Sequence, residues 1–127
     1  MKTIIATEKA PGAIGPYSQA VKAGNFVYVS GQLPIDPATG AFPADCIKAQ
    51  TRQSLKNVQS ILEAAGLTMD DVVKTTVFLQ NMGDFADMNG VYAEFFTKDC
   101  PARAAFQVAK LPKGALVEIE VVAYAGK

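Results

Sequence analysis

An arginine and two glutamates stand out near the end of the chain, because each lies in a segment that alternates apolar and polar residues. Arg103 begins the first segment (103–109), and Glu118 and Glu120 lie in the second (117–125). A period of two is typical of strands with one buried face, so we expect the guanidinium and both carboxylates to share a polar face. A guanidinium presents a planar fork of donors that matches a carboxylate, which indicates an anion site. The same pattern is also compatible with a structural ion pair between Arg103 and Glu118 or Glu120.

Several common kinds of active site have no support in the sequence. The chain has no histidine, which removes the commonest general base at neutral pH and the commonest metal ligand. Cys46 and Cys100 are far apart and lack C-x-x-C spacing, so neither a zinc site nor a disulfide is expected. None of the ten glycines belongs to a phosphate-binding loop motif. We therefore expect a site without a metal or cofactor.

Composition indicates a folded protein with no strong electrostatic partner. A chain of 127 residues fits a single domain over 1–127, and half of its residues are apolar. Twelve basic and twelve acidic residues give no net charge that would attract nucleic acid or an anionic membrane. No run of about 18 apolar residues occurs, and the N-terminus meets a charge before a secretory segment develops. We expect a cytoplasmic protein with neither nucleic acid nor membrane as a partner.

The first half of the chain predicts a hairpin, a loop and a helix. Strands are expected at 20–23 and 26–29 around a Gly-Asn turn. Glycines and prolines between 31 and 43 predict a long surface loop. A helix from Asp45, as N-cap, to Ala65 is indicated by apolar residues on one face, with Gly66 as the stop signal.

The second half predicts a strand, a helix and two more strands. The strand covers 72–79, and Asp84 is expected to cap a helix whose apolar positions extend to Phe96. The alternating segments 103–109 and 117–125 follow, joined by a turn at 111–114. This order predicts an α+β protein with a single mixed sheet and two helices packed on one face.

The alternating segments also carry a family signature. The run PARAAFQVAKLP at 101–112, followed by VEIE at 117–120, closely resembles the C-terminal signature of the RidA family (reactive intermediate deaminase; YjgF-like, or UK-type translation inhibitors). The resemblance covers the whole chain, including AIGPYSQ at 13–19, SGQ at 30–32, EAAG at 63–66 and VKTTVF at 73–78. It implies a chorismate-mutase-like fold in a homotrimer with a barrel-like centre and clefts between subunits.

The resemblance further implies a reaction and a set of residues. The reaction is hydrolysis of reactive enamines and imines released by pyridoxal-phosphate enzymes, such as 2-iminobutanoate and 2-iminopropanoate, to 2-oxo acids and ammonia. No cofactor is implied. Small 2-imino and 2-oxo carboxylates would be the ligands. The implied catalytic residues are Arg103, which clamps the carboxylate, Glu118, which positions or activates water, and Tyr17; the implied substrate-binding residues are Ser30, Gly31, Asn89 and Ala105.

Other interpretations of these residues and of the protein remain open. Tyr17 is also compatible with ordinary packing, Ser30 with a turn cap and Asn89 with a solvated helix position. Many relatives carry cysteine where this chain has Ala105, so thiol chemistry at that position is excluded. The alternative functions are an endoribonuclease-type translation inhibitor and a non-catalytic, carboxylate-binding regulatory protein.

Overall fold

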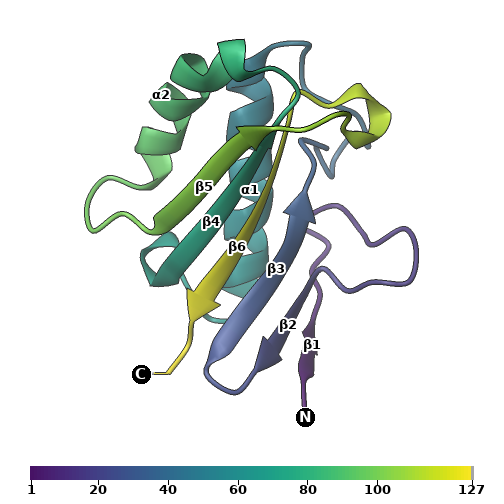
Figure 1. Ribbon diagram of the computed structural model, residues 1–127. Helices are drawn as coiled ribbons and strands as arrows, with labels where there is room; N and C mark the ends of the chain where they lie inside the picture. Colours follow the sequence, from purple (N-terminus) through teal and green to yellow (C-terminus); the bar gives the residue numbers. More distant parts are fainter. Residues whose placement is uncertain (127) are drawn as a thin grey trace.

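Six strands form one mixed sheet, and two α-helices cover one of its faces, in the computed structural model, which describes residues 1–126 (Figure 1). This arrangement confirms the predicted α+β class. The strands are β1 (Thr3–Ile5), β2 (Ala20–Ala23), β3 (Phe26–Gln32), β4 (Val72–Leu79), β5 (Ala102–Gln107) and β6 (Val117–Tyr124). The α-helices are α1 (Ile47–Ala64) and α2 (Phe85–Phe95), and short 3-10 turns occur at η1 (Met69–Asp71), η2 (Met82–Asp84) and η3 (Pro112–Gly114).

The strand order in the sheet is β1-β2-β3-β6-β4-β5. Neighbours are antiparallel except β4 and β5, which run parallel because α2 carries the chain back across the sheet between them. β1 was not expected from the sequence, and it forms a three-residue edge strand beside β2. No α-helix in the described part of the chain is long and apolar enough to cross a membrane.

The helix starts differ from their predicted caps. α1 begins after Cys46, not after Asp45, and the Cys46 side chain makes no capping hydrogen bond. Asp84 does precede α2, but its side chain does not cap the helix either. The preceding turn η2 carries the local cap instead, because the Asn81 side chain accepts a hydrogen bond from the Gly83 N–H at 2.7 Å. Both helices therefore depend on packing more than on side-chain caps.

The predicted stop of α1 is confirmed. Gly66 has a φ of 77°, a left-handed conformation that glycine adopts without a steric penalty. The Gly66 N–H donates to the carbonyl of Glu63 at 3.0 Å, and the Leu67 N–H donates to that of Leu62 at 2.9 Å. These two bonds form a Schellman motif, which satisfies carbonyls at the helix end.

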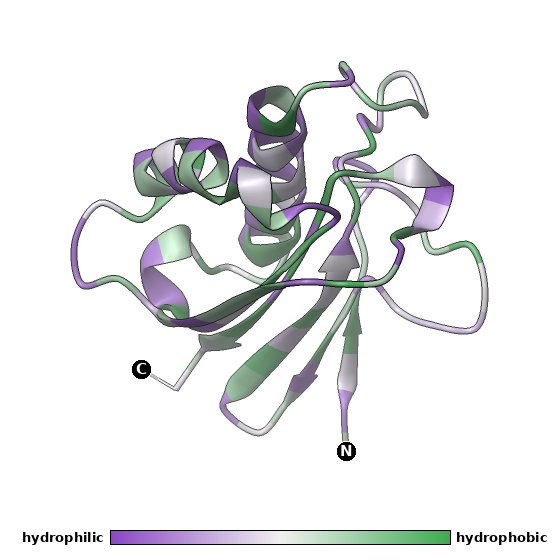
Figure 2. Ribbon diagram, turned by 45° about the horizontal axis from the view of Figure 1, so that its top comes forward, coloured by the Kyte–Doolittle hydropathy of each residue, from purple (hydrophilic) through white to green (hydrophobic). Residues whose placement is uncertain are grey.

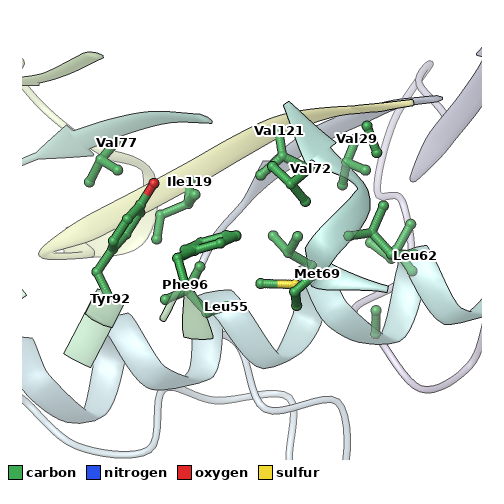
Figure 3. Packing of buried hydrophobic residues seen from close by; sticks show 14 of the residues in the cluster. Val29, Leu55, Leu62, Met69, Val72, Val77, Tyr92, Phe96, Ile119 and Val121 are labelled. Carbon is green, nitrogen blue, oxygen red and sulfur yellow. The ribbon is translucent and has the colours of Figure 1, made fainter. Parts of the chain in front are cut away.

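The core lies between the helices and one face of the sheet. The predicted apolar face of α1, including Leu55 and Leu62, is buried against β6 residues such as Ile119 and Val121 (Figure 3). This packing is reflected in the hydropathy of the residues: in Figure 2 the helices carry both hydrophilic and hydrophobic bands, while the strands are largely hydrophobic. The other face of the sheet is covered by no helix in residues 1–126, and we call it the open face.

Buried amides on α1 hold the loop that follows β3. The Asn57 amide donates to the carbonyls of Leu33 and Ile35 at 3.1 and 2.9 Å. Gln50 donates to the carbonyl of Ala44 at 2.9 Å. These contacts satisfy polar groups inside the protein and fix the path of the loop from 33 to 44.

Candidate functional site

β3 extends further than its sequence pattern suggested, and this extension places two of the expected site residues. Ser30 and Gly31 lie in the strand, not at the start of a loop, and the register with β6 shifts between Val29 and Gln32. A β-bulge changes the direction of side chains locally and is common beside functional sites. The Ser30 hydroxyl donates to the carbonyl of Ser18 at 2.6 Å, which ties β3 to the preceding loop.

Gly31 lies directly against the carboxylate of Glu118. A Cβ atom at Gly31 would be 3.0 Å from the Glu118 Cδ and closer still to its Oε2. The backbone at Gly31 is not left-handed, so the glycine is needed for space and not for its dihedral angles. The close approach leaves the carboxylate little room to move toward β3.

A hollow of about 1100 Å³ surrounds this carboxylate. We call the hollow and its polar residues the glutamate pocket; it is lined by Tyr17, Ser30, Gly31, Glu118 and Glu120, and by residues of the segments 7–14, 32–40 and 112–113. In Figure 1 the loops before β2 and after β3 and the turn η3 gather at this end of the sheet. Tyr17 is half exposed on the rim, at 52% of its surface.

Gln19 holds the rim of the glutamate pocket, a role that the sequence did not indicate. Its side chain is buried, its Oε1 accepts from the Thr7 N–H at 2.7 Å, and its Nε2 donates to the carbonyl of Pro11 at 2.7 Å. Its backbone carbonyl accepts from the Ser30 N–H at 2.9 Å. One glutamine therefore connects the lining loop to the strand that carries Ser30 and Gly31. Only a buried polar side chain in an irregular segment signals this role, and burial is not visible in a single sequence.

The environment of Glu118 favours its neutral form. Burial, and secondarily the negative charge of Glu120 on the same strand face, raise the pKa of the Glu118 carboxyl above its ordinary value. A carboxyl with a raised pKa is suited to exchanging a proton with bound water or substrate near neutral pH.

Arg103 belongs to a second cluster, on α2 and the edge strand β5. Its NH1 donates to the Oδ1 of Asn89 at 2.6 Å. Its guanidinium carbon lies 4.8 Å from the ring centroid of Tyr92 and 5.4 Å from that of Phe85. We call these four residues the arginine cluster. The two aromatic residues were predicted only as apolar positions of α2, although Phe85, Asn89 and Tyr92 have the spacing of one helix face.

The arginine cluster and the glutamate pocket lie on opposite faces of the sheet. Arg103 is paired with Thr75, which is buried on the helix side. Glu118 is paired with Phe78 on the same strand β4, and residues 75 and 78 of a strand point to opposite faces. The expectation of one shared face is therefore wrong, and so is the ion pair of Arg103 with Glu118 or Glu120. In residues 1–126 the ion pair that does form joins Arg52 to Glu94 at 2.8 Å.

The structure thus divides the expected site residues into two groups. Tyr17, Ser30, Gly31 and Glu118 come together in the glutamate pocket, while Asn89 contacts Arg103. Ala105 follows on the same face as Arg103 and is half buried beside the core. No group of three or more metal-ligating side chains lies together in the described part of the chain.

Comparison with known proteins places the chain among close relatives over its whole length. The model of a family described as endoribonuclease L-PSP matches residues 7–125. A RutC family protein of Pyrococcus horikoshii is 58% identical over 124 residues, covering 98% of each chain. The 2-iminobutanoate/2-iminopropanoate deaminase of Escherichia coli K12 is 53% identical over 126 residues, covering 97% of this chain and 98% of the relative. The crystal structure of E. coli TdcF with bound serine is similar with a TM-score of 0.92 and 49% identity, covering 96% of this chain and 98% of that one.

Proposed function

The chain belongs to the endoribonuclease L-PSP family, which includes the RidA proteins, and on this premise we propose that it hydrolyses small 2-imino acids to 2-oxo acids and ammonia. The proposed substrates are 2-iminobutanoate and 2-iminopropanoate, the compounds named for the E. coli relative. The proposed place of action is the cytoplasm, where pyridoxal-phosphate enzymes release such imines.

The observation that carries the proposal is a pair of complementary groups. Arg103 is exposed, is anchored through one N–H to Asn89 and keeps further donors for a carboxylate. Glu118 borders a hollow large enough for a small organic acid and has a raised pKa. The serine bound to the related TdcF is a small molecule with both a carboxylate and an amino group, which supports a ligand of this class.

The proposed chemistry needs little assistance. A protonated imine carbon is electrophilic, so water attacks it to give a tetrahedral carbinolamine, and Glu118 accepts the proton that water loses. That proton then returns to the nitrogen and the C–N bond breaks, and the carbinolamine hydroxyl passes its own proton through Glu118 to the departing ammonia, so that the carbonyl of the 2-oxo acid forms and ammonium leaves. Positioned proton transfer of this kind contributes about 10²- to 10⁴-fold in rate. Arg103 orients the substrate throughout by holding its carboxylate.

The two groups can act on one substrate if the site forms between copies of the chain. The open face carries exposed aromatic residues, among them Phe26, Tyr28, Phe106 and Tyr124, which are 39% to 47% exposed. A sheet face with several exposed aromatic residues favours coverage by another molecule. We propose a homotrimer in which Arg103 of one subunit faces the glutamate pocket of the next.

The direct test is ammonia release from imines generated in the assay by threonine dehydratase or an amino-acid oxidase. We expect the protein to accelerate release, and Arg103→Ala to lower kcat/KM by at least about 10- to 100-fold, the range for a charged hydrogen-bonded contact. Arg52→Ala is the matched control, since Arg52 pairs with Glu94 on the helices and lies outside both groups. Equal rates with and without the protein would contradict the proposal.

Two results would favour an alternative function of the protein. RNA cleavage that persists through purification and is lost in Arg103→Ala would favour the activity in the family's description. Binding of 2-oxo acids without any imine hydrolysis would favour a carboxylate-binding protein without catalysis.

A further inference from the structure

Three residues on one face of α2 converge on the Arg103 guanidinium. Asn89 accepts a hydrogen bond from it at 2.6 Å, and the ring centroids of Tyr92 and Phe85 lie 4.8 and 5.4 Å from its central carbon. Both ring distances are within the range of cation–π attraction. An exposed arginine otherwise samples many rotamers, and each would carry its charge to a different place.

Tyr92 is itself held in place at both ends. Its hydroxyl forms a hydrogen bond with the Thr75 Oγ1 at 2.8 Å, and its ring packs 4.7 Å from that of Phe96. Figure 3 shows the side chain reaching from α2 to the sheet, with the hydroxyl oxygen at the sheet end. The tyrosine is 7% exposed, so its ring has little freedom.

These contacts form a closed circuit. Thr75 is fully buried and is the β4 partner of Arg103 in the sheet. The backbone of β5 therefore fixes Arg103 relative to Thr75, Thr75 fixes the Tyr92 hydroxyl, and the Tyr92 ring faces the guanidinium. The Arg103 guanidinium is thereby held by contacts that start from Thr75, the residue that pairs with the Arg103 backbone.

We propose that Tyr92, assisted by Phe85, is a positioning residue that pre-orders the Arg103 guanidinium and so sets the affinity of the site for the substrate carboxylate. This inference rests on the proposed function for its kinetic consequences. A carboxylate contact is the same in substrate and transition state, so its loss raises KM and leaves kcat nearly unchanged. Pre-ordering acts by lowering the conformational cost of binding.

The first experiment compares Tyr92→Leu with Tyr92→Phe. Tyr92→Leu removes the ring, and we expect KM for 2-iminobutanoate and Kd for 2-oxobutanoate to rise about 2- to 30-fold, the range that one cation–π contact supplies. Tyr92→Phe keeps the ring and is expected to recover most of that affinity. Both variants lose the hydroxyl bond to Thr75, so a role that depended on that hydrogen bond would affect them alike.

A second readout needs no ligand. Arg52 and Arg103 are the arginines of the chain, so the side-chain Nε–H region of an NMR spectrum contains one signal of interest and one internal reference. We expect the Arg103 signal to be shifted by the aromatic rings and protected from exchange, and to move toward the free-arginine position in Tyr92→Leu. The Arg52 signal, beside Glu94, should not move. Phe85→Leu, at a half-buried position, provides a second ring deletion if Tyr92→Leu does not fold.

The two readouts separate this inference from the proposed function. Unchanged KM, Kd and Arg103 signal in both ring deletions would overturn the inference, as would a fall in kcat at constant KM. Absence of imine hydrolysis in the unaltered protein would overturn the proposed function alone, because 2-oxobutanoate binding and the Arg103 signal would still report on positioning.

Discussion

Arg103 and Glu118 project from opposite faces of one sheet, although a single strand, β4, separates the strands that carry them. The register makes this unavoidable, because Arg103 is opposite Thr75 and Glu118 is opposite Phe78. No rotamer change brings the two charged groups together through the sheet. If both act on one substrate, they come from different copies of the chain.

Mixing two impaired variants should therefore restore activity at substrate concentrations below KM. Arg103→Ala keeps the glutamate pocket, and Glu118→Gln keeps the arginine cluster. If the proposed trimers assemble at random from equal amounts of the two variants, roughly a quarter of all sites would combine both intact groups, as expected for a head-to-tail ring. The measurement is ammonia release by the purified mixed oligomer. A mixture no more active than either variant would contradict a shared site.

Gly31→Ala should reduce turnover more than binding. The added Cβ collides with the Glu118 carboxylate, which must shift away from β3. Displacement of a catalytic group by about 1 Å can lower the rate about 100-fold. We expect kcat to fall by about 10- to 100-fold on this basis, with a smaller change in the Kd of 2-oxobutanoate.

The matched control for this substitution is Gly90→Ala. A Cβ at Gly90, in α2, meets nothing within 4 Å, so the substitution adds the same methyl group without a collision. Similar kinetic losses in both variants would indicate a general effect of the methyl group and not displacement of Glu118.

Gln19→Leu should loosen the rim of the glutamate pocket. The substitution removes the amide that bonds to Thr7, Ala10 and Pro11 and leaves buried backbone groups without partners. Each such group costs about 1–3 kcal/mol, so we expect a loss of stability in that range or above. Urea unfolding at fixed protein concentration measures the loss, and hydrogen exchange should rise first in residues 7–12. Uniform exchange across the sheet would instead indicate global destabilisation.

Much of the fold follows from local patterns in the sequence. The apolar face of α1 and the stop at Gly66 are encoded within a few residues, and β6 alternates without interruption. β1 was not predicted, because a three-residue edge strand is too short to show an alternation of apolar and polar residues. The predicted strand at β3 was too short because a glycine such as Gly31 is a typical loop signal. In the structure Gly31 lies within the strand, and its missing side chain leaves room for the Glu118 carboxylate.

The division of the site could not be predicted from the same patterns. Alternation shows that a strand has two faces, but only the register between strands shows which faces coincide. Arg103 and Glu118 each alternate correctly within their own strands, yet the pairing of β4 with both neighbours places them apart. The aromatic residues around Arg103 were obscured for another reason, since Tyr92 also satisfies the apolar period of α2.

Glu120→Gln should shift the pH dependence of hydrolysis to lower pH. Glu118 must be ionised to accept a proton from water, so activity falls as pH decreases through its pKa. Burial and the Glu120 charge raise that pKa, and removing the charge eliminates the second cause only. The acidic limb of kcat should therefore move down while staying above the ordinary range of glutamate.

The raised pKa of Glu118 should also make the stability of the folded protein depend on pH. Activity rises as pH increases through this pKa, whereas the contribution of Glu118 to stability falls. Because the pKa of Glu118 is higher in the folded than in the unfolded chain, the folded state binds this proton more tightly. Its contribution therefore lowers stability as pH rises from the unfolded to the folded pKa. Glu118→Gln, which cannot ionise, should gain stability relative to the unaltered protein at neutral pH and not below the ordinary glutamate pKa.

Lys113 and Glu8 also line the pocket, so Lys113→Met and Glu8→Gln are the charge controls for the effect of Glu120→Gln on hydrolysis. An acidic limb that moves with these substitutions and not with Glu120→Gln would show that Glu120 is not the neighbour that tunes Glu118.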